Sequence, residues 1–186
     1  MDAETYKNLY RVASARWAGY DYGQNGAYFI TICTKDRQRF FGEIILPDGH
    51  WETAVLQESL PAQVARQCWA QISERFPFVV LDAFVIMPDH VHGLLLFDKP
   101  TSLLPPPAFE NRFGPQRDNL AAVVRGFKAG VTSRLQQQQQ VPFAWQPRFH
   151  DRVVRNSQEQ EKIQRYIAEN PARWKDESGK EDSLFR

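Results

Sequence analysis

The stretch FVVLDAFVIMPDHVHGLLLF, residues 78–97, contains two apolar runs that are separated only by Pro88-Asp89. Both runs are rich in β-branched and aromatic residues, a composition typical of strands, and so short a break favours a hairpin of antiparallel neighbours. We therefore predict strands over residues 78–87 and 90–97, joined tightly in the middle of a sheet.

Two further strands and a helix are expected before this hairpin. The run AYFITICTK, residues 27–35, and the shorter run at residues 41–46 have the composition of strands, and Pro47-Asp48-Gly49 closes the second. Apolar side chains recur every four residues over residues 58–76, where Pro61 suits a first helical turn. The N-terminal half thus combines strands with one helix.

Two more helices are expected after the hairpin. Residues 120–135 carry apolar side chains on one face and basic side chains on the others. Ser157 and Gln160 stand at capping-box spacing and begin a helix that should run to about Glu169. Because strands adjacent in sequence do not alternate strictly with helices, the pattern favours an α+β fold with a central antiparallel sheet covered by helices.

Two segments lack such periodicity. Residues 98–109 include Pro100 and the run PPP at residues 105–107, so we expect a stiff extended connector inside one domain that spans residues 1–186. The five glutamines at residues 136–140 are expected to form a loop.

Composition indicates a globular cytosolic protein. The chain is 42% hydrophobic and 13% aromatic, which is enough to bury a core. Its two cysteines, Cys33 and Cys68, are too few for a disulfide framework and are expected to be reduced. No apolar leader or membrane-length run occurs, so a cytoplasmic location is expected, and the chain lacks the Gly-rich phosphate loop of NTPases.

Positive charge is concentrated in one part of the sequence. The formal net charge of the chain is +1, but residues 111–155 hold eight basic and two acidic side chains, a local charge of +6. Such a segment can face phosphates, whereas the alternative is that these are ordinary solvated charges on helix surfaces.

His90 and His92 are two residues apart on a predicted strand, so both side chains should project from one face while Val91 points to the other. Two imidazoles on one rigid face can bind one metal ion. Local hydrogen bonding of both histidines is an equally good interpretation of the spacing alone.

Tyr166 and Asn170 lie four residues apart in the last predicted helix. Tyr166 is interpreted either as a core aromatic residue or as a nucleophile, which would need a nearby cation because the phenol has a reference pKa of about 10. Asn170 can share its helix face and complete a metal site. Alternatively, Asn170 caps a final short helix that begins at Pro171, since a residue before proline disfavours helical angles.

Four stretches resemble the single-tyrosine HUH transposases, and most closely the REP-associated tyrosine transposases. FVIMPDHVHGLLLF, residues 84–97, resembles their HUH strand, and FHDRVVRNSQEQEKIQRYIAENPARW, residues 149–174, resembles their tyrosine helix. VVRGFKAGVTSRL resembles the basic helix between them, and AYFITICTKDRQRFFGEI resembles the first strand and its turn. Asp89 departs from the family pattern, which often has Asn before the first histidine.

The resemblance implies an enzyme with the ferredoxin-like HUH nuclease fold that nicks and rejoins single-stranded DNA beside hairpins. Tyr166 would be the nucleophile of a 5′-phosphotyrosine intermediate, and His90, His92 and Asn170 would hold Mg²⁺ or Mn²⁺. Relatives act as dimers or as monomers, so oligomeric state stays open. Two rival functions are a catalytically silent hairpin-binding host factor and a Zn²⁺-dependent phosphoesterase that uses water.

The resemblance also implies hairpin and single-stranded DNA as partners. Phe127, Trp145 and Phe149 are expected to stack on unpaired bases, with core packing as the alternative for the last two. The basic residues expected to contact phosphates are Lys35, Arg37, Arg39, Arg125, Lys128, Arg148, Arg152 and Arg155.

Overall fold

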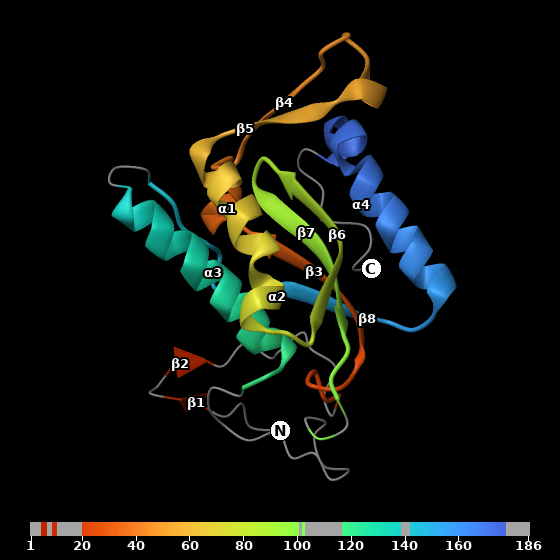
Figure 1. Cartoon of the computed structure of the whole chain (residues 1–186). Helices are drawn as coiled ribbons and strands as arrows, with labels where there is room; N and C mark the ends of the chain where they lie inside the picture. Colours follow the sequence, from red (N-terminus) through yellow and green to blue (C-terminus); the bar gives the residue numbers. More distant parts are fainter. Residues whose placement is uncertain are drawn as a thin grey trace.

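The centre of the molecule is a four-stranded antiparallel sheet with the strand order β6-β7-β3-β8. This computed structural model describes residues 5–6, 9–10, 20–100, 102, 117–138 and 142–177, and the side chains among residues 20–174 of these. Figure 1 shows α1 and α3 over one face of the sheet and α4 over the other. The predicted α+β class is therefore confirmed. The four strands are β3 (Gly26–Cys33), β6 (Val79–Met87), β7 (His90–Phe97) and β8 (His150–Val154).

The β6–β7 hairpin has the predicted position and turn. Met87 pairs with His90, so Pro88-Asp89 alone makes the connection, and the register shifts between Leu81 and Ala83. On its other side β7 pairs with β3, which puts Cys33 opposite His90. The hairpin thereby fixes the start of β7 between two neighbouring strands.

The face under α1 and α3 carries the larger core. Helix α1 (Leu60–Ala70) begins later than predicted because Ser59 accepts a hydrogen bond from the Ala62 N–H and acts as the N-cap. The expected single helix over residues 58–76 is divided at Gln71, after which α2 (Ile72–Arg75) follows. Buried residues of these helices pack against Tyr28, Ile30 and Ile32 of β3.

Helix α3 (Leu120–Gln137) begins where the Asn119 side chain accepts a hydrogen bond from the Ala122 N–H at 2.9 Å. It extends two residues beyond the predicted end. Gln136 and Gln137 are therefore helical rather than part of a loop, which their good helix propensity explains. Of the predicted glutamine loop, residues 139–140 lie outside the described residues.

Helix α4 (Ser157–Glu177) covers the opposite face and is one continuous helix through Pro171. Its predicted end near Glu169 is wrong, and so is the alternative of a separate final helix capped by Asn170. The capping interaction also lies one residue earlier than predicted, because Asn156 accepts from the Glu159 N–H at 2.9 Å. Beyond the proline, Trp174 is buried and its ring packs near His90, and this packing outweighs the helix-breaking preference of proline.

Several shorter elements complete the fold. The predicted strand at residues 41–46 is β4 (Gly42–Ile45), which pairs with β5 (Val55–Glu58) in a separate two-stranded ribbon. Strand β5 and the edge strand β8 were not predicted. The remaining elements are β1 (Thr5–Tyr6), β2 (Leu9–Tyr10) and two 3₁₀ turns, η1 (Lys35–Arg37) and η2 (Trp51–Thr53).

The predicted connector at residues 98–109 falls mostly outside the described residues, which include only 98–100 and 102 of it. Among the helices of the described part of the chain, none combines the length and apolar character required to cross a bilayer.

Candidate active site

His90 and His92 project from the same face of β7, as their spacing predicts. Both are buried, with 3% and 0% of their surface exposed, and their Nε2 atoms lie 3.0 Å apart. Val91 between them points into the core under α1 and α3. Strand geometry alone therefore brings the two imidazoles together on the α4 face of the sheet.

The other nitrogen of each ring contacts a protein oxygen. His90 Nδ1 lies 2.6 Å from Asp89 Oδ1, and His92 Nδ1 lies 2.7 Å from the hydroxyl of Thr31, its partner in the β3–β7 register. A ring that donates its N–H from Nδ1 has an unprotonated Nε2. With both rings in this tautomer, two lone pairs face one another and need a shared cation or proton.

Burial lowers the pKa of His92 well below its ordinary value, and the neighbouring His90 ring and the charge of Arg37 lower it further. His92 is therefore neutral near neutral pH. A neutral imidazole is the form that binds metals.

Arg37 supports this arrangement from η1. Its Nε lies 3.1 Å from Asp89 Oδ2, so Asp89 joins the guanidinium to the His90 ring. The backbone reaches this position through a left-handed turn in which Asp36 and Arg37 have φ values of 52° and 54°. Such angles are uncommon for residues other than glycine and are held here by the surrounding contacts.

Helix α4 brings Tyr166, Asn170 and Trp174 against the histidines. The Tyr166 and His92 ring centroids are 5.3 Å apart, and those of Trp174 and His90 are 6.2 Å apart. Residues four apart share a helix face, so Asn170 lies between two side chains that contact the histidine pair. The site thus combines one strand with one helix.

The Asn170 side chain is fully buried, and neither its oxygen nor its nitrogen has a hydrogen-bond partner among the described residues. A buried amide without a partner costs about 1–3 kcal/mol, so such groups usually mark an ion or water. Two imidazoles and an amide oxygen form a reasonable donor set for a divalent cation. No group of three His, Cys, Asp or Glu side chains with metal-binding geometry occurs among the described residues.

Comparisons with known proteins show to which family the chain belongs. No protein-family model matches it. An "Uncharacterized protein" of Haemophilus influenzae (strain ATCC 51907 / DSM 11121 / KW20 / Rd) is 33% identical over 180 residues, which cover 94% of this chain and 96% of that protein. The chain belongs to the family of this Haemophilus protein.

Comparison with a solved structure shows that the fold is shared with a known protein. The REP-associated tyrosine transposase bound to a REP hairpin matches with a TM-score of 0.56 and 19% identity, over 87% of this chain and 74% of that chain. At this identity the likeness shows a shared fold. The fold that the resemblance to REP-associated tyrosine transposases implies is therefore confirmed, and the family of the Haemophilus protein has it too.

The eight basic residues predicted to bind DNA belong to several segments of the fold. Arg37 lies beside the histidines, and the Arg39 guanidinium lies 5.7 Å from the centre of the Trp174 ring. Arg152 is paired with Glu159, with Nε 2.8 Å from Oε1, and the same carboxylate accepts the Arg155 N–H. Arg125 and Lys128 belong to α3, and Arg148 lies in the segment before β8.

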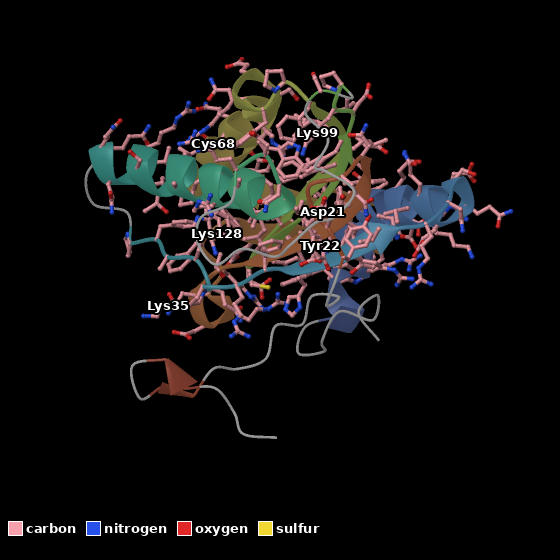
Figure 2. All side chains as sticks on the ribbon, turned by 90° about the horizontal axis from the view of Figure 1, so that it is seen from below. Asp21, Tyr22, Lys35, Cys68, Lys99 and Lys128 are labelled. Atoms are coloured by element: carbon pink, nitrogen blue, oxygen red, sulfur yellow. The ribbon has the colours of Figure 1, made fainter. Side chains whose placement is uncertain are left out.

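Lys35 and Lys128 lie at the same end of the molecule (Figure 2), and both contact the segment at residues 144–146. Among the aromatic residues expected to stack on bases, Phe127 is only 3% exposed and packs between Trp69 and Trp145. The stacking role predicted for Phe127 is therefore wrong, because the residue belongs to the core. Trp145 and Phe149 are partly exposed.

Sequence reasoning did not identify two residues of the site. Thr31 holds the His92 ring, but only the β3–β7 register places it there. Trp174 lies one helical turn beyond Asn170, and the spacing of residues 166, 170 and 174 would have indicated it if the helix had been extended through Pro171.

Proposed function

We propose that this chain is a metal-dependent single-tyrosine DNA transposase that nicks and rejoins single-stranded DNA beside hairpins. One observation carries the proposal: Tyr166 and Asn170, whose buried amide has no hydrogen-bond partner among the residues that the structure describes, lie on the α4 face that packs against His90 and His92. The solved REP-associated tyrosine transposase, whose fold the chain shares, is bound to a REP hairpin, and this supports DNA hairpins as the substrate class.

His90 and His92, through Nε2, and Asn170, through its amide oxygen, are the residues that would hold Mg²⁺ or Mn²⁺. Such an ion, when bound, polarises a phosphodiester oxygen and stabilises negative charge that develops on the phosphate. Asp89 and Thr31 keep the two rings oriented by their contacts with Nδ1.

Tyr166 would act as the nucleophile. Its Oη attacks the phosphorus and releases its proton, the bond from phosphorus to the 3′ oxygen breaks, and that oxygen takes up a proton to become a 3′-hydroxyl. The downstream DNA stays attached as a 5′-phosphotyrosine. Attack by another strand's 3′-hydroxyl reverses these bonds and rejoins DNA without an energy cofactor.

The site also offers groups that bind and orient the strand. Arg37 and Arg39 flank the histidines and Trp174, where their charges favour a phosphate next to the nucleophile. Tyr166 packs between His92 and Phe29, whose ring centroid lies 6.2 Å from that of the tyrosine. These contacts hold the phenol ring beside the histidine pair, with 7% of the residue exposed.

The test is incubation of the protein with Mn²⁺ and labelled hairpin DNAs that carry single-stranded extensions, followed by a denaturing gel. The expected product is a protein–DNA adduct that is absent with Tyr166→Phe and with a chelator, and present with Tyr22→Phe as the matched control. Hairpin binding without an adduct or nick in any library member would support a silent DNA-binding factor instead. Nicking that survives Tyr166→Phe would support hydrolysis by water.

A further inference from the structure

A third histidine, His150, lies on the same face of the sheet as the two histidines of the candidate active site. In the strand registers, His92 of β7 pairs with Thr31 of β3, and Thr31 pairs with His150 of β8 on its other side. Residues directly opposite one another in neighbouring strands project from one face of the sheet. His150 is therefore two strand spacings, or about 10 Å, from His92, with Thr31 between them.

This face of the sheet is covered at β7 and open at β8. Helix α4 lies mainly over β6 and β7. Along the row of paired residues, His92 and Thr31 are buried, whereas His150 is exposed. The next row changes in the same way, from the buried Phe29 to its exposed register partner Arg152. A DNA strand can therefore approach the site from the β8 side.

Tyr166 marks where a reacting phosphate would lie on this face. Its ring lies against His92 of β7 and Phe29 of β3. In a displacement at phosphorus, the attacking and leaving oxygens are roughly in line, on opposite sides of the phosphorus atom. Because α4 carries Tyr166 and covers β6 and β7, a phosphate that Tyr166 attacks has its leaving oxygen directed towards β8. His150 stands on that side.

The side chains on that side differ in what they can do for a leaving oxygen. A 3′ oxygen that leaves phosphorus needs a proton, and a side chain placed beside it can supply one. An imidazole can give and take up a proton near neutral pH. The guanidinium of Arg152 keeps its protons, and the Thr31 hydroxyl contacts His92. His150 is therefore the member of these two rows best suited to exchange a proton with the DNA.

We propose that His150 is a catalytic residue that exchanges a proton with the 3′ oxygen of the cleaved DNA. The inference rests on the proposed function, because it concerns the strand that Tyr166 attacks. It adds to that function a proton donor for the leaving oxygen and places the 3′ end of the cleaved strand over the β8 edge of the sheet.

The same residue serves both directions of the reaction. In cleavage, the bond from Tyr166 Oη to phosphorus forms and the bond from phosphorus to the 3′ oxygen breaks. The Tyr166 proton passes to water, and the imidazolium of His150 gives its proton to the 3′ oxygen. In rejoining, the neutral imidazole takes the proton from the attacking 3′-hydroxyl, the tyrosine–phosphorus bond breaks, and the phenolate takes a proton from water.

The experiment compares two hairpin DNAs that differ in one atom at the bond cleaved by the wild type. One has the ordinary 3′ oxygen, and the other has sulfur in its place. A thiol is much more acidic than an alcohol, so a sulfur leaving group needs no proton from the protein. His150→Gln should cleave the oxygen substrate about 100-fold more slowly than the wild type and the sulfur substrate at nearly the wild-type rate. Single-turnover cleavage with Mn²⁺, followed on denaturing gels, measures these rates.

Two control variants separate proton transfer from other effects. His50→Gln changes an exposed histidine before η2 and should leave both rates unchanged. Asp89→Ala, which loosens the His90 ring, should slow both substrates. The unfolding temperature of His150→Gln and its affinity for the hairpin should match those of the wild type, because His150 is exposed on an edge strand.

The outcomes distinguish failure of this role from failure of the whole chemistry. If the wild type cleaves and His150→Gln slows the two substrates equally, or slows neither, His150 does not exchange a proton with the leaving oxygen and only this inference is overturned. If the wild type cleaves neither substrate while it binds both, the proposed function is overturned together with the role of His150.

Discussion

The Nε2 atoms of His90 and His92 lie 3.0 Å apart in the protein interior, and each ring is held from behind by an oxygen at its Nδ1. When each ring donates its hydrogen from Nδ1, the two Nε2 lone pairs face one another and need a shared cation or proton. The oxygens at Nδ1 thus fix the orientation of both rings.

Asp89→Ala should weaken Mn²⁺ binding by about 10–100-fold, because His90 loses the carboxylate that orients its ring. Asp89→Asn keeps an oxygen acceptor and should lie between Asp89→Ala and the wild type. Isothermal titration calorimetry with Mn²⁺ measures the affinities, and Asp48→Asn in an exposed turn is the control. Equal affinities for wild type and Asp89→Ala would show that Asp89 does not support the metal site.

Asn170→Leu should leave the metal-free protein as stable as the wild type or stabilise it, because it removes a buried amide that has no hydrogen-bond partner within the described part of the chain. The same variant should lose most of the rise in Tm that saturating Mn²⁺ produces, since that rise depends on binding to the folded state. Thermal unfolding with and without Mn²⁺ separates the two effects. A large destabilisation of the metal-free variant would instead assign Asn170 a structural hydrogen bond.

Gly93→Ala should destabilise the protein by about 1–3 kcal/mol through overpacking. A Cβ at Gly93 would lie 2.1 Å from the Trp69 ring, which stacks on Phe84 with a centroid distance of 4.2 Å. Gly93→Ala should cost less free energy of unfolding when it is added to the Trp69→Leu variant than when it is added to the wild type, as measured by urea unfolding. Independent, additive losses would contradict this contact as the reason for glycine after His92.

Glu159 should stabilise the start of α4 in a pH-dependent manner. Burial raises its pKa, but the Arg155 N–H and the charge of Arg152 outweigh this, so the net pKa is lowered. A lowered pKa stabilises the fold above the unfolded value of about 4.3 and loses this effect as the pH falls through the folded value. Glu159→Gln should therefore cost up to about 1 kcal/mol at neutral pH and almost nothing near pH 3. A cost that is independent of pH would exclude the ionic contribution.

The sequence predicted those parts of the fold in which composition and periodicity agree. The β6–β7 hairpin, the helices over the sheet and the shared face of His90 and His92 all follow from local patterns. Strand β8 was not predicted because it is a five-residue edge strand with the sequence HDRVV, in which charged residues obscure the alternation of apolar and polar side chains. Strand β5, with the sequence VLQE, is short and half exposed, so it has no distinctive signal.

The course of α4 could not be predicted because two local preferences of the chain conflict with its packing. Pro171 normally ends or bends a helix, yet the side chains of Tyr166, Asn170 and Trp174 meet the sheet along one face and the helix continues. The contact of Thr31 with His92 depends on strand register, which no spacing in the sequence encodes. The site is therefore predictable within each element, but not between elements.

The most direct test of the catalytic proposal is peptide mapping by mass spectrometry of the chain after reaction with Mn²⁺ and extended hairpin DNA. The account predicts that the DNA fragment is attached through its 5′ phosphate to the peptide that contains Tyr166. Attachment to another residue, or nicked DNA without any attached protein, would contradict Tyr166 as the nucleophile.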